Sequence, residues 1–174
     1  MNEHSFTLII IGDVDSHIDE LFEAGCDDAT FGAVDAVAYG EFDRVAPTFA
    51  EAVASGIAAV ESIPGLRVIR VEPDDFVTAA DIAARLGRSR ESVRLLIGGK
   101  RGPGGFPAPV SHLCSKHRLW RWSAIANWLG EADEKTKLQA RTIAALNAAL
   151  ELRESLPSLS PEDRALVAAL ERAS

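Results

Sequence analysis

The hydrophobic positions at the start of the chain change from the spacing of a strand to that of a helix. Residues 6–12 form a short apolar run with three adjacent isoleucines, which is typical of a buried strand. Residues 15–23 have the spacing of an amphipathic helix, which Asp15 or Ser16 would cap and Gly25 would end. The pattern therefore predicts a strand followed closely by a helix.

A second strand-and-helix pattern follows the first. Short strands are expected over residues 28–33 and 36–42, and the spacing of Thr48 and Glu51 is that of a capping box that opens a helix. The apolar positions of this helix recur every three or four residues: Phe49, Val53, Ile57, Val60 and Ile63. Residues 66–71 read as a last strand. The order β-α-β-β-α-β predicts a ferredoxin-like domain, with two helices on one face of a four-stranded antiparallel sheet.

The last part of the chain reads as helical. Residues 132–152 are rich in leucine and alanine, Pro157 interrupts the pattern, and Ser160 with Asp163 opens a shorter helix. We expect an α+β protein in three parts: an acidic ferredoxin-like domain over residues 1–73, a second domain over residues 74–130, and C-terminal helices over residues 131–174 that are candidates for dimerisation.

Charge is distributed unevenly among these parts. The net charge is −8, which by itself argues against a nucleic-acid partner. Residues 1–75, however, carry 3 basic and 16 acidic side chains, whereas residues 76–130 carry 9 basic and only 2 acidic ones. A basic block inside an acidic protein is typical of a surface that meets nucleic acid.

The basic block begins with the pattern of a helix-turn-helix. Thr78 and Asp81 have capping-box spacing, small Ala83 allows two helices to cross closely, and Gly87 permits a turn. Ser89 then caps a second helix over residues 90–97, in which Val93 and Leu96 are the expected core positions. This second helix would be the recognition helix, and its predicted groove-facing residues are Ser89, Arg90, Glu91, Ser92 and Arg94.

A glycine-rich cationic link and a hairpin are expected after the second helix. Residues 98–105 supply the link, with Lys100 and Arg101, and residues 106–110 are extended because of their prolines. Residues 111–118 would form the tip of a hairpin, with Lys116, His117 and Arg118 in it. The alternating residues 119–122 would return as a strand, and Ser123 would cap a short helix over residues 124–129.

Over Phe76–Gly130 this order resembles the winged helix-turn-helix of bacterial DNA-binding proteins of the AlpA, excisionase and MerR-like group. The resemblance covers about a third of the chain. It implies that the second helix enters the major groove. It also implies phosphate or minor-groove contacts from Lys100, Arg101, Lys116, His117 and Arg118.

Other chemistry is less well supported by the sequence. His112, Cys114 and His117 fall short of the four ligands and the spacing of a zinc site. Acidic pairs such as Asp13/Asp15 and Asp27/Asp28 have no accompanying nucleophile and base. We therefore expect no metal, no cofactor and no enzymatic activity. The tryptophans Trp120, Trp122 and Trp128 could stack on bases, but their spacing favours the core.

The sequence thus predicts a cytoplasmic protein that binds double-stranded DNA sequence-specifically, in transcriptional regulation, as a homodimer. No signal peptide or apolar run of bilayer length is present, and Cys26 and Cys114 are expected as free thiols. The acidic domain could serve dimerisation, sense a ligand or partner, or mask the basic surface. The alternative to DNA binding is a protein-interaction adaptor whose acidic domain binds a partner protein.

Overall fold

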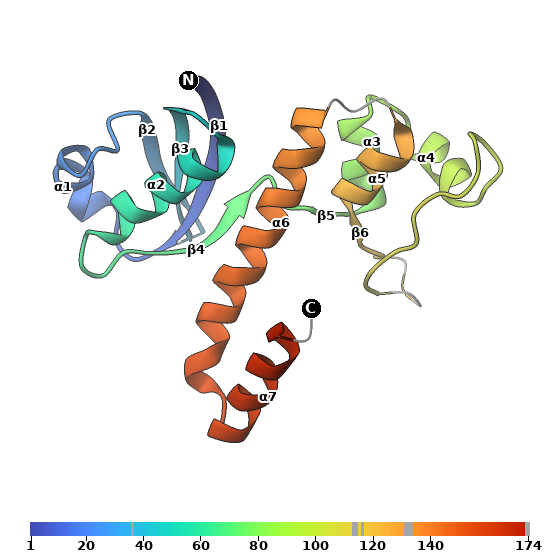
Figure 1. The fold of residues 1–174 in the computed structure, drawn as a ribbon. Coiled ribbons are helices and arrows are strands. Elements are labelled where there is room, and N and C mark those ends of the chain that lie inside the picture. Colours follow the sequence, from blue (N-terminus) through green and yellow to red (C-terminus); the bar gives the residue numbers. More distant parts are fainter. Residues whose placement is uncertain (36, 113–114, 116, 131–133, 173–174) are drawn as a thin grey trace. The chain divides into compact units, whose positions relative to one another are not determined.

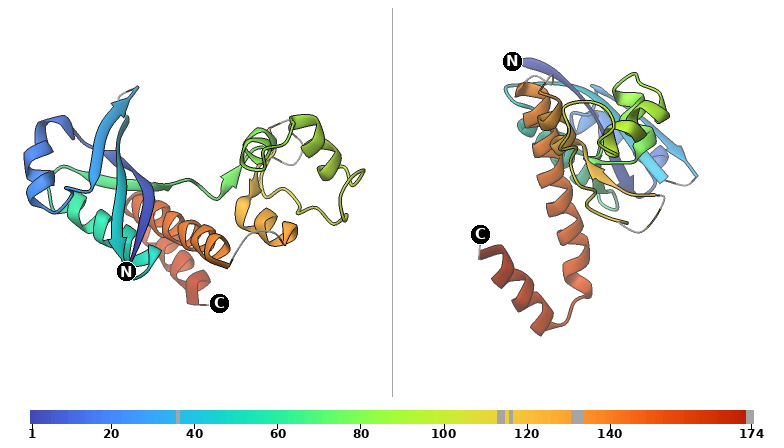
Figure 2. Two further views of the ribbon diagram at one scale, coloured as in Figure 1. Left: turned by 90° about the horizontal axis from the view of Figure 1, so that it is seen from above. Right: turned by 90° about the vertical axis from the view of Figure 1, so that its right-hand side faces the viewer.

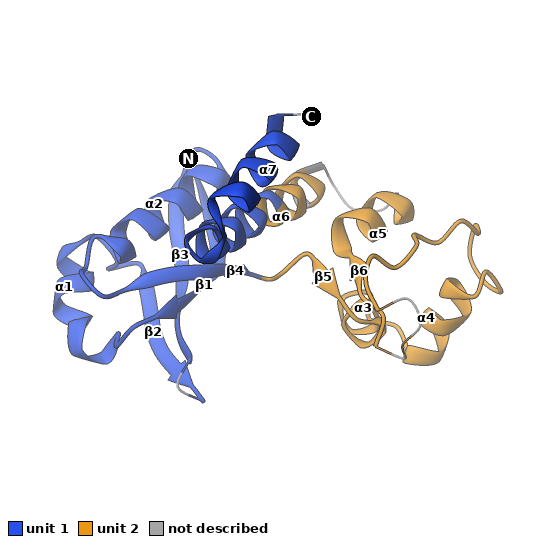
Figure 3. Cartoon of the chain, turned by 90° about the horizontal axis from the view of Figure 1, so that it is seen from below, with its two compact units in different colours: residues 1–72, 145–174 blue, residues 73–144 orange. Residues whose placement is uncertain are grey.

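The computed structural model describes residues 1–35, 37–112, 115, 117–130 and 134–172. The chain forms two compact units, which we treat separately (Figure 3). Unit 1 comprises residues 1–72 and 145–174, and unit 2 comprises residues 73–144. The fold is mixed α+β with an antiparallel sheet, as the sequence predicted. The C-terminal part is divided between the units, because the long helix α6, Glu134–Ser155, begins in unit 2 and ends in unit 1.

Unit 1 is built on a four-stranded sheet in the order β2-β3-β1-β4, with antiparallel neighbours throughout (Figure 1). The strands are β1 Asn2–Ile11, β2 Ala29–Val34, β3 Val37–Ala46 and β4 Arg67–Glu72. The 3-10 turn η1 Asp15–His17 and α1 Ile18–Glu23 lie between β1 and β2, and α2 Phe49–Glu61 lies between β3 and β4. Figure 2 shows from two sides that the β2–β3 hairpin projects past the other strands.

Helix α2 covers one face of the sheet and forms the core of unit 1 with it. Phe6 and Leu8 of β1 and Phe42 of β3 are at most 4 % exposed, and the rings of Phe6 and Phe42 stack 5.2 Å apart. Gly56 permits the close approach of α2, because a Cβ atom there would lie 3.2 Å from the ring of Phe6. The predicted cap at Thr48 is present, with its Oγ1 accepting from the Glu51 N–H at 3.2 Å.

Strand β4 contains an irregularity that strict alternation did not predict. Ile9 of β1 pairs with Arg70 and the next residue, Ile10, pairs with Val68, so Ile69 is an extra residue in the ladder. The bulge gives the two fully buried residues of β4, Val68 and Val71, a spacing of three instead of two.

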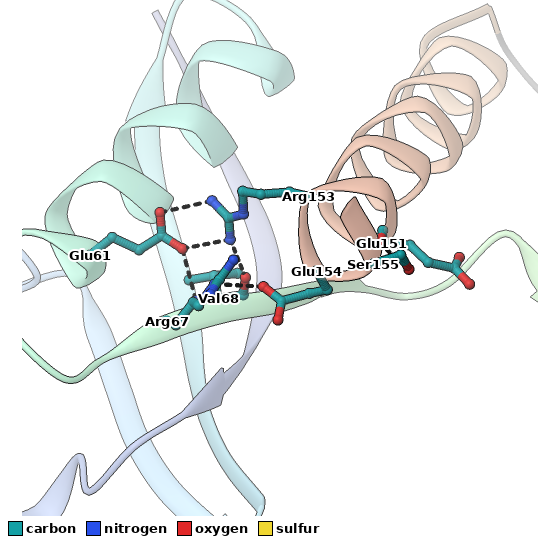
Figure 4. Close-up of polar contacts among 7 residues, drawn as sticks. All are labelled: Glu61, Arg67, Val68, Glu151, Arg153, Glu154 and Ser155. Atoms are coloured by element: carbon teal, nitrogen blue, oxygen red, sulfur yellow. Dashed lines mark hydrogen bonds and ion pairs between the residues drawn. The ribbon is translucent and has the colours of Figure 1, made fainter. Parts of the chain in front are cut away.

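The outer edge of β4 is covered by side chains of α2 and α6 (Figure 4). Glu61 accepts from the Val68 N–H at 3.0 Å, and Arg153 donates to the Val68 carbonyl at 2.6 Å. Arg153 also pairs with both carboxylate oxygens of Glu61, at 3.0 and 2.7 Å. One turn and a half earlier in α6, Asn147 accepts from the Val71 N–H at 2.8 Å and donates to its carbonyl at 2.9 Å. The edge is therefore closed to further strand pairing at both positions.

The first helix differs from its prediction. Neither Asp15 nor Ser16 caps α1. Instead, Asp13 accepts from the Ser16 N–H at 3.3 Å and from its hydroxyl at 2.6 Å, so the turn begins two residues earlier. Phe22, which the sequence pattern places on the apolar face of this helix, is 65 % exposed.

The C-terminal helices follow the predicted break. After α6 the 3-10 turn η2, Leu156–Ser158, contains Pro157, and α7 runs over Pro161–Arg172. Ser160 caps α7 by accepting from the Asp163 N–H at 3.1 Å. No residue of α7 is buried.

Besides the first part of α6, the described residues of unit 2 form three short helices and a two-stranded sheet. Its elements are β5 Phe76–Val77, α3 Ala79–Arg85, α4 Arg90–Ile97, β6 Trp120–Arg121 and α5 Trp122–Leu129. Strands β5 and β6 pair antiparallel.

We expect Asn147→Leu to lower the free energy of unfolding by about 2 kcal/mol or more, because it leaves the buried N–H and C=O of Val71 without partners. Urea unfolding followed by circular dichroism measures this. The matched control is Asn127→Ala, which removes only an exposed 3.4 Å contact with Arg141 and should change stability by less than about 0.5 kcal/mol. Equal effects of the two variants would contradict the role given to Asn147.

Candidate nucleic-acid interface

Two short helices and a tight turn form the centre of unit 2, with the predicted caps in place. Thr78 and Asp81 make a complete capping box, in which Asp81 accepts from the Thr78 N–H at 2.8 Å and Thr78 accepts from the Asp81 N–H at 3.3 Å. The bonds from Thr78 lower the pKa of Asp81. Gly87 has φ of +59°, and Ser89 caps α4 by accepting from the Ser92 N–H at 3.2 Å. Local sequence thus fixes where α4 begins and the turn that precedes it.

The inner sides of these helices share one hydrophobic core. Its buried members are Val77, Ile82, Ala83, Val93, Trp120 and Ile125. Ala83 and Val93, which the sequence assigned to the contact between helices, are 4 % and 0 % exposed. Since Val93 and Leu96 point inward, the residues between them on the other side of α4 face solvent.

The outer face of α4 carries charge. Arg90, Glu91 and Arg94 are exposed, and Ser92 is half-buried. Arg94 makes a two-pronged pair with Glu91, at 2.8 and 2.7 Å. The hydrogen bond from Arg94 lowers the pKa of Glu91, and the same bond raises the pKa of Arg94. The charge of Arg94 is therefore partly compensated by Glu91, in a pair that is exposed to solvent.

Other cations near α4 are unpaired. Among the described residues, none pairs with the side chains of Arg88, Arg90 or Lys100, which are all exposed. Arg101 donates to the hydroxyl of Ser92 at 3.5 Å, so one cation of the link after α4 lies beside this helix. Arg88 was not among the residues predicted from the sequence. Its position between Gly87 and the cap residue Ser89, just before α4, is the signal that could have identified it.

The glycine-rich link is anchored by aromatic residues. The indole N–H of Trp128 donates to the Gly104 carbonyl at 2.7 Å, and that of Trp120 donates to the Pro107 carbonyl at 3.1 Å. The ring of Phe106 packs against Trp128, 5.0 Å between centroids. Gly102 lies so close to α4 that a Cβ atom would come within 2.9 Å of Leu96. The tryptophans therefore hold the loop, and Trp120, at 3 % exposure, is a core residue as predicted.

The predicted hairpin forms only in part. Ser111 and Leu119 make an isolated antiparallel bridge, and the returning strand β6 pairs with β5 rather than with residues 106–110. His117 and Arg118 are exposed, and Arg118 lies over the Trp120 ring at 5.9 Å. Among the described residues, no hydrogen bond or ion pair joins these two side chains to α4, and Lys116 lies outside those residues.

Asp75 connects β5 and β6 with α5. It caps this helix in place of Ser123, which was predicted as the cap. Ser123 is not the N-cap, because α5 already begins at Trp122. The carboxylate of Asp75, 2 % exposed, accepts from the Ser123 N–H at 2.7 Å, the Ser123 hydroxyl at 3.1 Å and Arg121 at 3.1 Å. Its backbone carbonyl accepts from the Trp122 N–H at 2.6 Å. A residue from the start of unit 2 thus supplies the cap of its last short helix.

Among the remaining candidates for chemistry, Asp13 and Asp28 have structural roles. Asp28 makes a two-pronged pair with Arg44, both contacts at 2.7 Å, and Asp13 holds the turn at Ser16. Cys26 is a buried free thiol whose pKa is raised by burial, and Cys114 lies outside the described residues. No three metal-binding side chains come together in the described ranges. None of the described helices is long and apolar enough to cross a bilayer.

Comparison of the chain with family models, with curated proteins and with solved structures returned no match.

We expect Asp75→Asn to lower the stability of the protein by about 1–3 kcal/mol, since the amide cannot accept all three bonds that the buried carboxylate accepts. Ser123→Ala removes only the hydroxyl contact and should cost less. Urea unfolding of both variants, followed by tryptophan fluorescence, tests this order. If Ser123→Ala is the more damaging change, Asp75 does not organise α5.

Proposed function

We propose that this chain is a sequence-specific DNA-binding protein that acts in transcriptional regulation, with unit 2 as a winged helix-turn-helix. The observation that carries the proposal is the outer face of α4, which follows a tight glycine turn and presents exposed arginines while the opposite side packs into the core. In this interpretation α4 enters the major groove.

The cations divide into two roles in this proposal. Arg90 and Arg94, one turn apart on α4, face the bases, and arginine forms two-pronged contacts with guanine. Arg88, Lys100 and Arg101 flank the helix and neutralise phosphates. The link that carries Lys100 and Arg101 acts as part of the wing, together with the partial hairpin that carries His117 and Arg118.

Charge favours the same assignment. Residues 76–130 carry a net charge of +7 in a protein whose first 75 residues carry −13. The acidic part repels the DNA backbone, so DNA approaches through the basic block. The strand order of unit 1, β2-β3-β1-β4 with the helices inserted after β1 and β3, supports a ferredoxin-like fold for the acidic part.

The proposal predicts salt-dependent binding to duplex DNA, measured by fluorescence polarisation on a sequence enriched from a random pool. Arg90→Ala should weaken binding to the selected sequence by about 5- to 150-fold, with little effect on unrelated DNA. Lys100→Ala should weaken binding to every sequence and reduce the salt slope by about one. Arg67→Ala, in unit 1, is the control and should change neither.

Absence of salt-dependent binding to any DNA would overturn the proposal. Identical effects of Arg90→Ala and Lys100→Ala would leave DNA binding in place but remove the assignment of base and phosphate contacts.

The Glu91–Arg94 pair generates a separate prediction. Glu91→Gln should strengthen binding to all DNA at low salt, because it removes the negative charge that faces the DNA and partly compensates Arg94. Glu3→Gln makes the same change of net charge on an exposed position of β1 and controls for it. If the two variants bind DNA equally well, Glu91 does not lie at the interface.

A second candidate function is favoured by one feature of unit 1. The sheet face opposite α2 has an open hollow of about 280 Å³, and its lining includes Ile9, Tyr39, Glu41 and Glu72. Such a face fits an adaptor that binds a partially cationic protein segment. Recovery of a stoichiometric partner whose binding is abolished by Tyr39→Ala, in a protein that binds no DNA, would favour the adaptor.

A further inference from the structure

Helix α7 lacks the burial that normally stabilises a helix of its length. It has twelve residues, none of them buried, and Leu166 and Leu170, one turn apart, are 62 % and 66 % exposed. A helix this short is marginal in water unless its apolar face packs against something. Within the described chain, that outer face has no such packing.

Helix α6 has a second apolar side as well. Asn147 and Leu150 face the sheet of unit 1 and are buried. On the other side, Ala148 and Ala149 are exposed and Leu152 is half-buried. Figure 1 shows α7 folded back beside the end of α6. An open hollow of about 480 Å³ remains at the two helices, lined by Ala148, Ala149, Leu152, Arg153, Leu156, Pro157 and Glu171.

The distribution of charge indicates which partner can cover the exposed apolar sides of α6 and α7. Two copies repel each other if they meet through the acidic first 75 residues, and again through the basic block. The hairpin over residues 145–172 carries three basic and five acidic side chains, and Arg153 and Glu154 are already paired within unit 1, with Glu61 and Arg67. It is therefore the nearly neutral surface through which identical copies can approach.

We propose that two copies of this chain associate through their α6–α7 hairpins about a two-fold axis. Leu166 and Leu170 of each copy pack over Ala148, Ala149 and Leu152 of the other. The leucines fill the partner's hollow, and the alanines allow the helices to approach closely. A two-fold arrangement satisfies both leucine faces at once, because each contact occurs twice.

Both helices must contribute to this interface. A stable dimer buries about 800 Å² on each partner, which two leucines alone do not supply. The facing sides of both α6 and α7 are therefore required at the contact. The association does not depend on DNA binding. If unit 2 binds DNA as proposed, the dimer carries two copies of α4.

The test is sedimentation velocity of the full chain over a range of concentrations and salt. The wild type should reach twice the chain mass of 18.6 kDa and stay associated at high salt. The double change Leu166→Glu and Leu170→Glu should raise the dimer dissociation constant at least about tenfold. Phe22→Glu, which alters an equally exposed residue on α1, should leave it unchanged. Circular dichroism checks that helix content is retained in each variant.

Charge pairing tests the register of the contact. A chain with Leu166→Glu and a chain with Ala148→Lys should each dimerise poorly, and mixing them should restore dimers, since the new charges face each other across the interface. Three results would overturn the proposal. They are a wild type that stays monomeric, a dimer dissociation constant that the leucine changes do not alter, and a dimer that dissociates at high salt. The last result would indicate contact between the acidic and basic parts of different copies. DNA-binding measurements on the same variants keep the two proposals separate.

Discussion

The outer edge of β4, which has no neighbouring strand in the described chain, is the constraint on which the structure of unit 1 depends. A strand at the border of a sheet has backbone groups that no neighbouring strand satisfies, and those of Val68 and Val71 lie at a buried position. Glu61, Arg153 and Asn147 satisfy them, so α2 and α6 are tied to the same strand. The end of the chain must therefore return to the first unit, and α6, fixed by one side, presents its alanines on the other.

In unit 2, one buried acidic residue satisfies the backbone groups at the start of α5 that need a partner. Asp75 fixes β6 and the start of α5, so none of the cations on α4 is needed for that purpose. The arginines of unit 2 consequently differ in availability. Arg121 pairs with Asp75 and lies over Phe76, and Arg85 lies over Trp122. Arg90 pairs with no described residue, which leaves its guanidinium available to a ligand.

Most of the charged side chains and the exposed leucines lie on different surfaces of this protein. The basic block suits a polyanion, the acidic first 75 residues repel one, and the C-terminal hairpin, with a small net charge, carries the exposed leucines. Because like charges oppose self-association at the first two surfaces, the proposed ligand and the proposed second copy do not compete for the same residues. Both proposals follow from one asymmetric distribution of charged side chains.

Features that depend on neighbours within a few residues could be predicted from the sequence. The caps at Thr48, Thr78 and Ser89, the positive φ of Gly87 and the inward side of α4 are local, and all were predicted. Three features depend on the folded chain: the bulge at Ile69, the pairing of β6 with β5, and the use of Asp75 and Asn147 as partners for distant backbone groups. These last features join residues up to 76 positions apart, and no periodicity along the chain records which distant group will need a partner.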